Sequence, residues 1–151
     1  MDIFTCELVY NRKAKELAIP VTLRCSDCGK PGHKLIDCVG IIDTGATSSM
    51  LSEVVAEELQ LYPCGEISVS GVHGADNSNL YFVDIVFGSG YTLSNHRVSG
   101  ASGNAGFDLL IGMDILSLGE LHLVSVHGNS VFRFGIPSLS DKTAQVSAPS
   151  W

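Results

Sequence analysis

The segment VGIIDTGATSSML, residues 39–51, is the most informative part of the sequence. An apolar run leads to Asp43, and the small residues Thr44, Gly45 and Ala46 then form a tight turn. This arrangement holds a carboxylate on rigid backbone and leaves room for another chain segment beside it. Because Asp, Thr and Gly are also common in ordinary turns, the tripeptide needs support from elsewhere in the chain.

A second apolar segment, FDLLIGMDIL at residues 107–116, provides that support. It predicts a strand that runs into Gly112, followed by a short helix that begins at Met113 or Asp114 and stops at Gly119. Asp114 has no Thr-Gly sequel, so we interpret it as an acidic residue at a helix start, where the helix dipole favours it.

Together the two segments resemble the aspartic proteases of the retroviral type and their retrotransposon-like and cellular relatives. The resemblance covers roughly Ile19 to Phe134 and keeps the order of the parts. It implies a mostly β, retropepsin-like acid protease fold with a closed, barrel-like subunit and one or two short helices. In that family Asp43 would be catalytic, the Thr44 hydroxyl would lock two active-site loops together, and Gly45 would permit close approach of the substrate. Leu110, Ile111 and Gly112 would pack beneath the turn.

Hydrolysis by this route requires two carboxylates that share one proton, because like charges about 3 Å apart cannot both ionise. The chain contains one Asp-Thr-Gly motif. A proteolytic function therefore predicts a homodimer in which Asp43 meets Asp43 across a two-fold axis. No metal or other cofactor takes part in that reaction.

The segment between the two motifs, residues 66–87, has two alternating strands around the turn-rich centre VHGADNS. It predicts a hairpin that would close over an extended peptide as a flap. The substrate-binding candidates are therefore Val72, His73, Gly74 and Ala75 at the tip, with Ala46 in the catalytic turn. For His73 a solvated loop histidine is the simpler interpretation.

The segment CSDCGKPGHKLIDC, residues 25–38, has the spacing of a zinc knuckle. Its candidate ligands are Cys25, Cys28, His33 and Cys38, which could close a tetrahedral site with structural zinc on a hairpin tip. The alternative is a metal-free hairpin with three ordinary cysteines. The segment also resembles nucleocapsid knuckles, but Ser26 and Leu35 stand where those present stacking residues, and its local charge is faint. We therefore do not expect nucleic-acid binding.

The remaining pattern is mostly β, with short runs of apolar residues separated by Gly, Ser, Asn and Asp. We expect strands at Phe4–Tyr10, Ile19–Arg24, Cys38–Asp43, Ile67–Val72, Leu80–Phe87, Tyr91–Val98, Phe107–Ile111, Leu121–Val126 and Ser130–Phe134. The segment SEVVAEELQL predicts one short helix, with Ser52 as its candidate cap.

Length and composition set the limits of these hypotheses. The chain has 151 residues, 9 Lys and Arg against 16 Asp and Glu, and a formal net charge of −7. We expect one protease domain at residues 1–135, with residues 25–38 as an insertion, and a polar tail at residues 136–151. The acidic balance opposes a general phosphate-binding surface. An odd cysteine count and the lack of a long apolar run predict a cytoplasmic protein with no membrane contact.

Two functions remain open at this point. The first is a homodimeric aspartic endopeptidase that acts on an extended peptide or protein substrate. The second is a catalytically silent protein of the same fold that binds peptides or partners and carries a structural zinc hairpin.

Overall fold

The computed structural model describes residues 6–26, 34–71, 74–102 and 104–136, with the backbone alone at residues 69–71 and 74–76. The elements are β1 (Cys6–Val9), β2 (Ala18–Cys25), β3 (Leu35–Ile42), β4 (Met50–Ser52), α1 (Glu53–Glu58), β5 (Gly65–Gly71), β6 (Gly74–Phe87), β7 (Thr92–Ala101), β8 (Leu109–Ile111), α2 (Met113–Leu116), β9 (Glu120–Val126) and β10 (Asn129–Gly135). The mostly β fold with two short helices is thus confirmed. The sequence analysis missed β4, and it placed the start of β3 three residues late.

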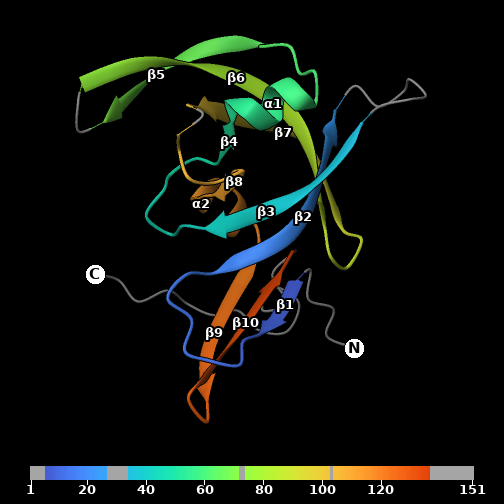
Figure 1. Ribbon diagram of the computed structural model, residues 1–151, viewed down its shortest axis with the longest axis vertical. Coiled ribbons are helices and arrows are strands. Elements are labelled where there is room, and N and C mark those ends of the chain that lie inside the picture. The colour runs from blue at the N-terminus through green and yellow to red at the C-terminus, as the bar shows by residue number, and fades with distance from the viewer. Residues whose placement is uncertain (1–5, 27–33, 72–73, 103, 137–151) are drawn as a thin grey trace, which may run out of the picture.

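Six strands form a closed barrel in the order β2-β3-β8-β4-β7-β6, which closes where β2 pairs with β6. The β3–β8 and β4–β7 pairs are parallel, whereas the other pairs are antiparallel. β6 runs on beyond the barrel and pairs with β5, so one strand serves both as barrel wall and as one arm of a hairpin. That hairpin arches over the top of the molecule in Figure 1.

A second, three-stranded sheet in the order β1-β10-β9 lies below the barrel in Figure 1. Alternate residues of β10 point inward, and Phe132 and Phe134 are completely buried. They belong to the same apolar cluster as Ile19 and Leu23 of β2, so the barrel and the lower sheet share one core. Burial of each of these phenylalanines stabilises the fold by about 1.5–3 kcal/mol.

A partly buried ion pair fixes the seam at which β2 meets β6. Arg24 and Asp84 are register partners there, and Arg24 Nε donates to Asp84 Oδ2 at 3.0 Å. The backbone N–H of Asn95 donates to Asp84 Oδ1 at 2.7 Å. Burial raises the pKa of Asp84, but the hydrogen bonds from Asn95 and Arg24 outweigh that effect and leave the pKa below its usual range.

The two helices are short and support neighbouring strands. Val55 and Ala56 of α1 are buried in the core. Ser52 occupies the N-cap position of α1, but its hydroxyl makes no capping hydrogen bond, so the predicted cap is wrong in its chemistry. Glu53, in the first turn, instead accepts a hydrogen bond from the Tyr81 hydroxyl of β6 at 2.6 Å. In the part of the chain that the structure describes, no helix has the length and apolar character needed to cross a membrane.

Candidate active site

Asp43 lies immediately after β3, at the point where β3 runs parallel to β8. Its backbone N–H donates to the Ile111 carbonyl oxygen at 2.9 Å and so extends the β3–β8 pairing into the turn. Its side-chain oxygen Oδ1 accepts the Gly45 N–H at 2.9 Å, and its carbonyl accepts the Ala46 N–H at 3.2 Å. The carboxylate is partly exposed, so it is oriented by backbone donors and still open to solvent.

The loop after Asp43 rests directly on the start of α2. The Met113 N–H donates to the Ala46 carbonyl at 2.8 Å, and the Asp114 N–H donates to the Thr47 carbonyl at 3.1 Å. A Cβ atom at Gly112 would lie 2.8 Å from the Ala46 oxygen and 2.9 Å from the Ser48 oxygen. Only glycine therefore allows the two segments to approach this closely.

A buried polar cluster holds this contact from below. The Ser49 hydroxyl, which is completely buried, donates to Asp114 Oδ1 at 2.7 Å and accepts the Gly112 N–H at 3.0 Å. His96 Nε2 lies 2.9 Å from Asp114 Oδ2. Burial raises the pKa of Asp114, but the hydrogen bonds from His96 and Ser49 outweigh it, so the pKa lies below its ordinary value.

The sequence analysis treated Asp114 only as an acidic residue at a helix start. It does lie in the first turn of α2, but side chains are its main partners. The cluster contains Ser, His and Asp without forming a hydrolytic triad, because the Ser49 hydroxyl is buried and bonds to the carboxylate instead of the imidazole. The sequence could have indicated Ser49, because this hydroxyl residue directly precedes the apolar pair Met50 and Leu51. No local signal in the sequence indicates His96.

The other candidate residues fall on the turn and the hairpin. Thr44 is exposed on the turn. The β5–β6 hairpin exists as predicted, with Gly71 paired to Gly74 and Ser70 paired to Ala75. Val72 and His73, which connect the two strands, lie outside the described residues.

Two of the predicted zinc ligands, Cys25 and Cys38, lie on the hairpin formed by β2 and β3. Cys38 lies opposite Val21, whereas Cys25 lies one position beyond the Arg24–Leu35 pair. The two cysteines are therefore four residues apart along the ladder, or about 13 Å.

The surroundings of Cys38 favour the neutral thiol. Burial and the charges of Asp108 and Asp37 raise the pKa of Cys38 to about 12. No group of three or more metal-ligating side chains occurs among the described residues, and Cys28 and His33 lie outside them. The four-ligand zinc site therefore stays a prediction, because two of its ligands are not described.

The geometry holds the partly exposed Asp43 carboxylate rigidly at the end of β3. The other acidic side chain close to the turn, Asp114, is engaged by Ser49 and His96. A closed barrel, a covering hairpin and an Asp-Thr-Gly turn docked on a Gly-led helix together define a retropepsin-like fold. The family model described as "gag-polyprotein putative aspartyl protease" matches residues 37–118, which is more than half of the chain. The chain belongs to this aspartyl protease family.

Solved structures of related proteins show the same fold. The retropepsin-like aspartic protease from Rickettsia conorii is 14% identical, with 87% of this chain and 93% of that chain covered and a TM-score of 0.54. The EIAV protease in complex with the inhibitor HBY-793 is 22% identical, with 73% and 92% covered and a TM-score of 0.51. The retroviral protease-like domain of Ddi1 from Leishmania major is 14% identical, with 82% and 95% covered and a TM-score of 0.51. No curated protein matches the chain.

The first prediction concerns the contact at Gly112. Gly112→Ala should reduce the free energy of unfolding by about 3 kcal/mol, because the new methyl group would meet backbone atoms that cannot rotate away. Chemical denaturation measures the change. The matched control is Gly88→Ala, where a Cβ would meet nothing within 4 Å and stability should hardly change. Equal stability of the two variants would contradict the close contact.

The second prediction concerns Asp114 and pH. Because its pKa is lowered in the folded chain, this carboxylate stabilises the fold above the ordinary carboxyl pKa of about 3.9, and the stabilisation is lost as pH falls through the folded-state pKa. Asp114→Asn should therefore cost about 2 kcal/mol at pH 7 and much less at low pH. Urea denaturation of both proteins across this pH range tests the expectation, and a cost that does not vary with pH would refute it.

Proposed function

We propose that the protein is an aspartic endopeptidase that works as a homodimer and hydrolyses peptide bonds in an extended substrate. The observation that carries the proposal is the Asp43 carboxylate, which is partly exposed and oriented by the Gly45 N–H at the end of β3. Membership of the aspartyl protease family supports the same reaction class.

The chemistry requires a second copy of the chain. One Asp43 carboxylate activates a water molecule while its counterpart, which carries the shared proton, polarises the substrate carbonyl. Two such groups about 3 Å apart hold a single proton between them, so activity should be highest at mildly acidic pH. No step of this reaction uses zinc.

The remaining candidate residues receive roles within that dimer. Thr44 would fix the two turns against each other, and Gly45 and Ala46 would leave room for the substrate backbone. The β5–β6 hairpin, with Val72, His73, Gly74 and Ala75 at its tip, would close over the peptide and bind it through strand-like hydrogen bonds.

The lower sheet offers a surface for the second copy. β9 is the outer strand of that sheet among the described residues, and Leu123, Val124 and Val126 are 54%, 48% and 47% exposed. An apolar edge strand readily pairs with another strand, and antiparallel pairing of β9 with β9 obeys two-fold symmetry. In Figure 1, β9 and the end of β3 that carries Asp43 lie on the same side of the molecule. Pairing through β9 would therefore bring this side of each copy toward its partner.

The third prediction tests catalysis. Asp43→Asn should lower the rate of cleavage of unfolded protein substrates at least about a thousandfold, since it removes the ionisable group that activates water. Product analysis by mass spectrometry at mildly acidic pH gives the rate, and thermal melting checks that the fold is retained. The control is Asp37→Asn, an exposed acid on the same strand, which should cleave like the parent. If Asp43→Asn also cleaves like the parent, the assignment is wrong.

The fourth prediction tests the dimer. Leu123→Lys combined with Val124→Lys should convert a dimer into a monomer in sedimentation experiments and abolish cleavage, because paired edges would bring like charges together. Tyr62→Lys changes an apolar side chain that is 91% exposed elsewhere on the surface and should alter neither property. Full activity in a persistent monomer would overturn the two-carboxylate mechanism.

A further inference from the structure

The first half of β3 has an open edge. β8 is three residues long and pairs only with Gly40–Ile42, whereas β2 covers the other edge of β3 along nearly its whole length. The N–H groups of Asp43 and Val39 both point toward the β8 side, where they donate to Ile111 and to the Asp108 carboxylate. Because backbone groups in a strand alternate, those of Leu35 and Asp37 face the same side. Within the described residues, no hydrogen bond from another strand reaches them there.

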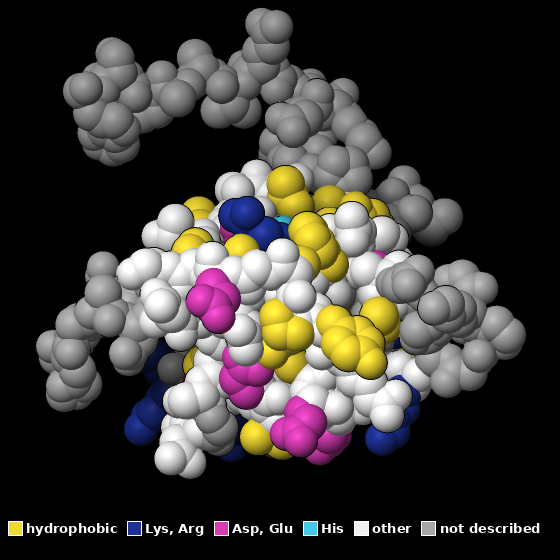
Figure 2. Space-filling model, turned by 90° about the horizontal axis from the view of Figure 1, so that it is seen from above, with side chains coloured by type: hydrophobic (Ala, Val, Ile, Leu, Met, Phe, Trp, Pro, Cys, Tyr) yellow, Lys and Arg dark blue, Asp and Glu magenta, His cyan; other side chains and the backbone are white. Residues whose placement is uncertain are grey.

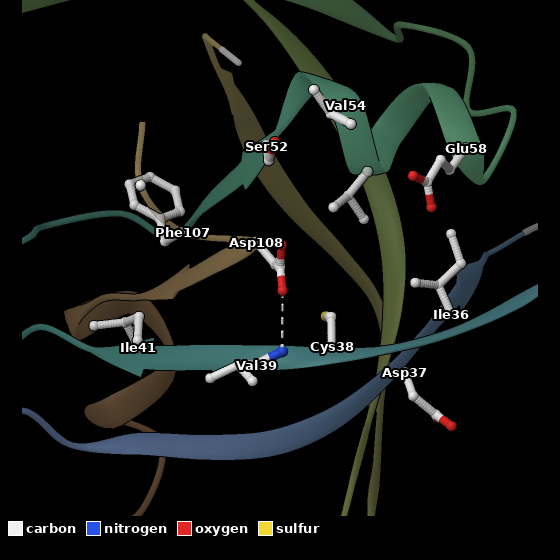
Figure 3. A pocket seen from close by; sticks show the side chains of 12 residues that line it. Ile36, Asp37, Cys38, Val39, Ile41, Ser52, Val54, Glu58, Phe107 and Asp108 are labelled. Atoms are coloured by element: carbon white, nitrogen blue, oxygen red, sulfur yellow. Dashed lines mark hydrogen bonds between the residues drawn. The ribbon is translucent and has the colours of Figure 1, made fainter. Parts of the chain in front are cut away.

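A groove of about 530 Å³ lies along this edge, between β3 and helix α1. Figure 3 shows Cys38 and Val39 on β3, Val54 and Glu58 on α1 opposite, and Asp108 in the middle of the groove. The volume is within the usual range for ligand-binding sites. The extended edge from Leu35 to Val39 measures about 13 Å, which matches a peptide of about five residues.

The lining combines apolar and acidic side chains. Val39 and Val54 are 43% and 49% exposed, which leaves apolar surface in contact with solvent. Glu58 lies on the α1 side and Asp108 on the β8 side, whereas Asp37 points away from the groove in Figure 3. Among the residues that the structure describes, no Lys, Arg or His contributes to the lining. Figure 2 likewise shows acidic and hydrophobic side chains interspersed on the face seen from above.

The groove is separate from the proposed catalytic cleft. None of its lining residues belongs to the Asp43–Ser49 loop or to the hairpin of β5 and β6. It nevertheless runs along the strand that delivers Asp43, and Ile41 lies at its end nearest the turn. A ligand in the groove could therefore bind at the same time as a peptide under the hairpin.

We propose that this groove binds an extended peptide segment with basic side chains, which adds as a strand to the open edge of β3. The backbone groups of Leu35 and Asp37 would supply main-chain hydrogen bonds. Because strand side chains alternate, the apolar side chains of the peptide would contact Val39 on one face of β3, and its Lys or Arg side chains would meet Glu58 and Asp108 on the α1 side. This binding does not depend on the proposed peptidase activity.

The fifth prediction is measured on the full chain with Asp43→Asn, so that no ligand is cleaved. The probe is the blocked peptide Ac-Val-Lys-Val-Lys-Val-NH2, followed by fluorescence polarisation and by amide NMR shifts. We expect saturable binding, with the largest amide shifts at Leu35 and Asp37. Glu58→Gln and Asp108→Asn should each weaken binding about fivefold. Asn at position 108 keeps an oxygen that can accept the Val39 N–H, so the fold should be unaffected.

Matched controls separate the site from general charge attraction. Glu57→Gln removes the same charge from the neighbouring residue of α1, which does not line the groove, and should leave affinity unchanged. N-methylation of the central valine of the peptide should weaken binding about tenfold, because it blocks a strand hydrogen bond. The proposal is overturned by no saturable binding up to about 1 mM, by equal loss in Glu57→Gln, by equal affinity for Ac-Val-Glu-Val-Glu-Val-NH2, or by shifts confined to residues 43–46.

Discussion

The short parallel ladder between β3 and β8 is the constraint on which the candidate site depends. It pairs Ile42 with Ile111 and continues through the hydrogen bond from Asp43 N–H to the Ile111 carbonyl. Two glycines allow the segments that meet at this ladder to approach each other closely. A Cβ at Gly40 would lie 2.8 Å from the Ile111 side chain, and one at Gly112 would meet the backbone of the catalytic loop. The position of the carboxylate is therefore set by backbone packing, which is stiffer than side-chain contact alone.

The polar cluster of Ser49, Asp114 and His96 below the turn adds directional hydrogen bonds to that packing. Core residues such as Leu109 and Ile111 are fully buried but exert non-directional forces. Ser49 and Asp114, by contrast, tie the end of the loop, the Gly112 N–H and helix α2 together through hydrogen bonds of defined geometry. Since a half-satisfied buried network is costly, these bonds favour one arrangement of the loop. A rigid loop is what two symmetry-related carboxylates would need in order to meet at a short distance.

The sequence predicted those features that depend on local pattern. Alternation of apolar residues gave most strands, and the Asp-Thr-Gly turn with the Gly112 segment gave the family. β4 has only three residues, too few for a periodic signal, and the contact between His96 and Asp114 joins segments 18 residues apart that no motif links. The zinc prediction stays open, because two of its four ligands lie outside the described residues. Ligand spacing is a local pattern, whereas strand register is fixed by the whole set of β2–β3 pairs and places Cys38 opposite Val21.

β3 carries both the candidate catalytic turn and the groove, because the short strand β8 covers only part of its edge. A longer β8 would cover Leu35 and Asp37 and close the barrel wall completely, but its chain must also turn at Phe107 to meet β4 through the Ser52 N–H and the Asp108 carbonyl. Helix α1 covers only part of the gap, and its residues Val54 and Glu58 stay accessible. Charged side chains often protect exposed strand edges from pairing with another strand. Among the described residues, Asp108 does so at Val39, whose N–H its carboxylate accepts. The fold thus leaves one end of β3 free for pairing while it holds the other end, with Asp43, in a fixed position.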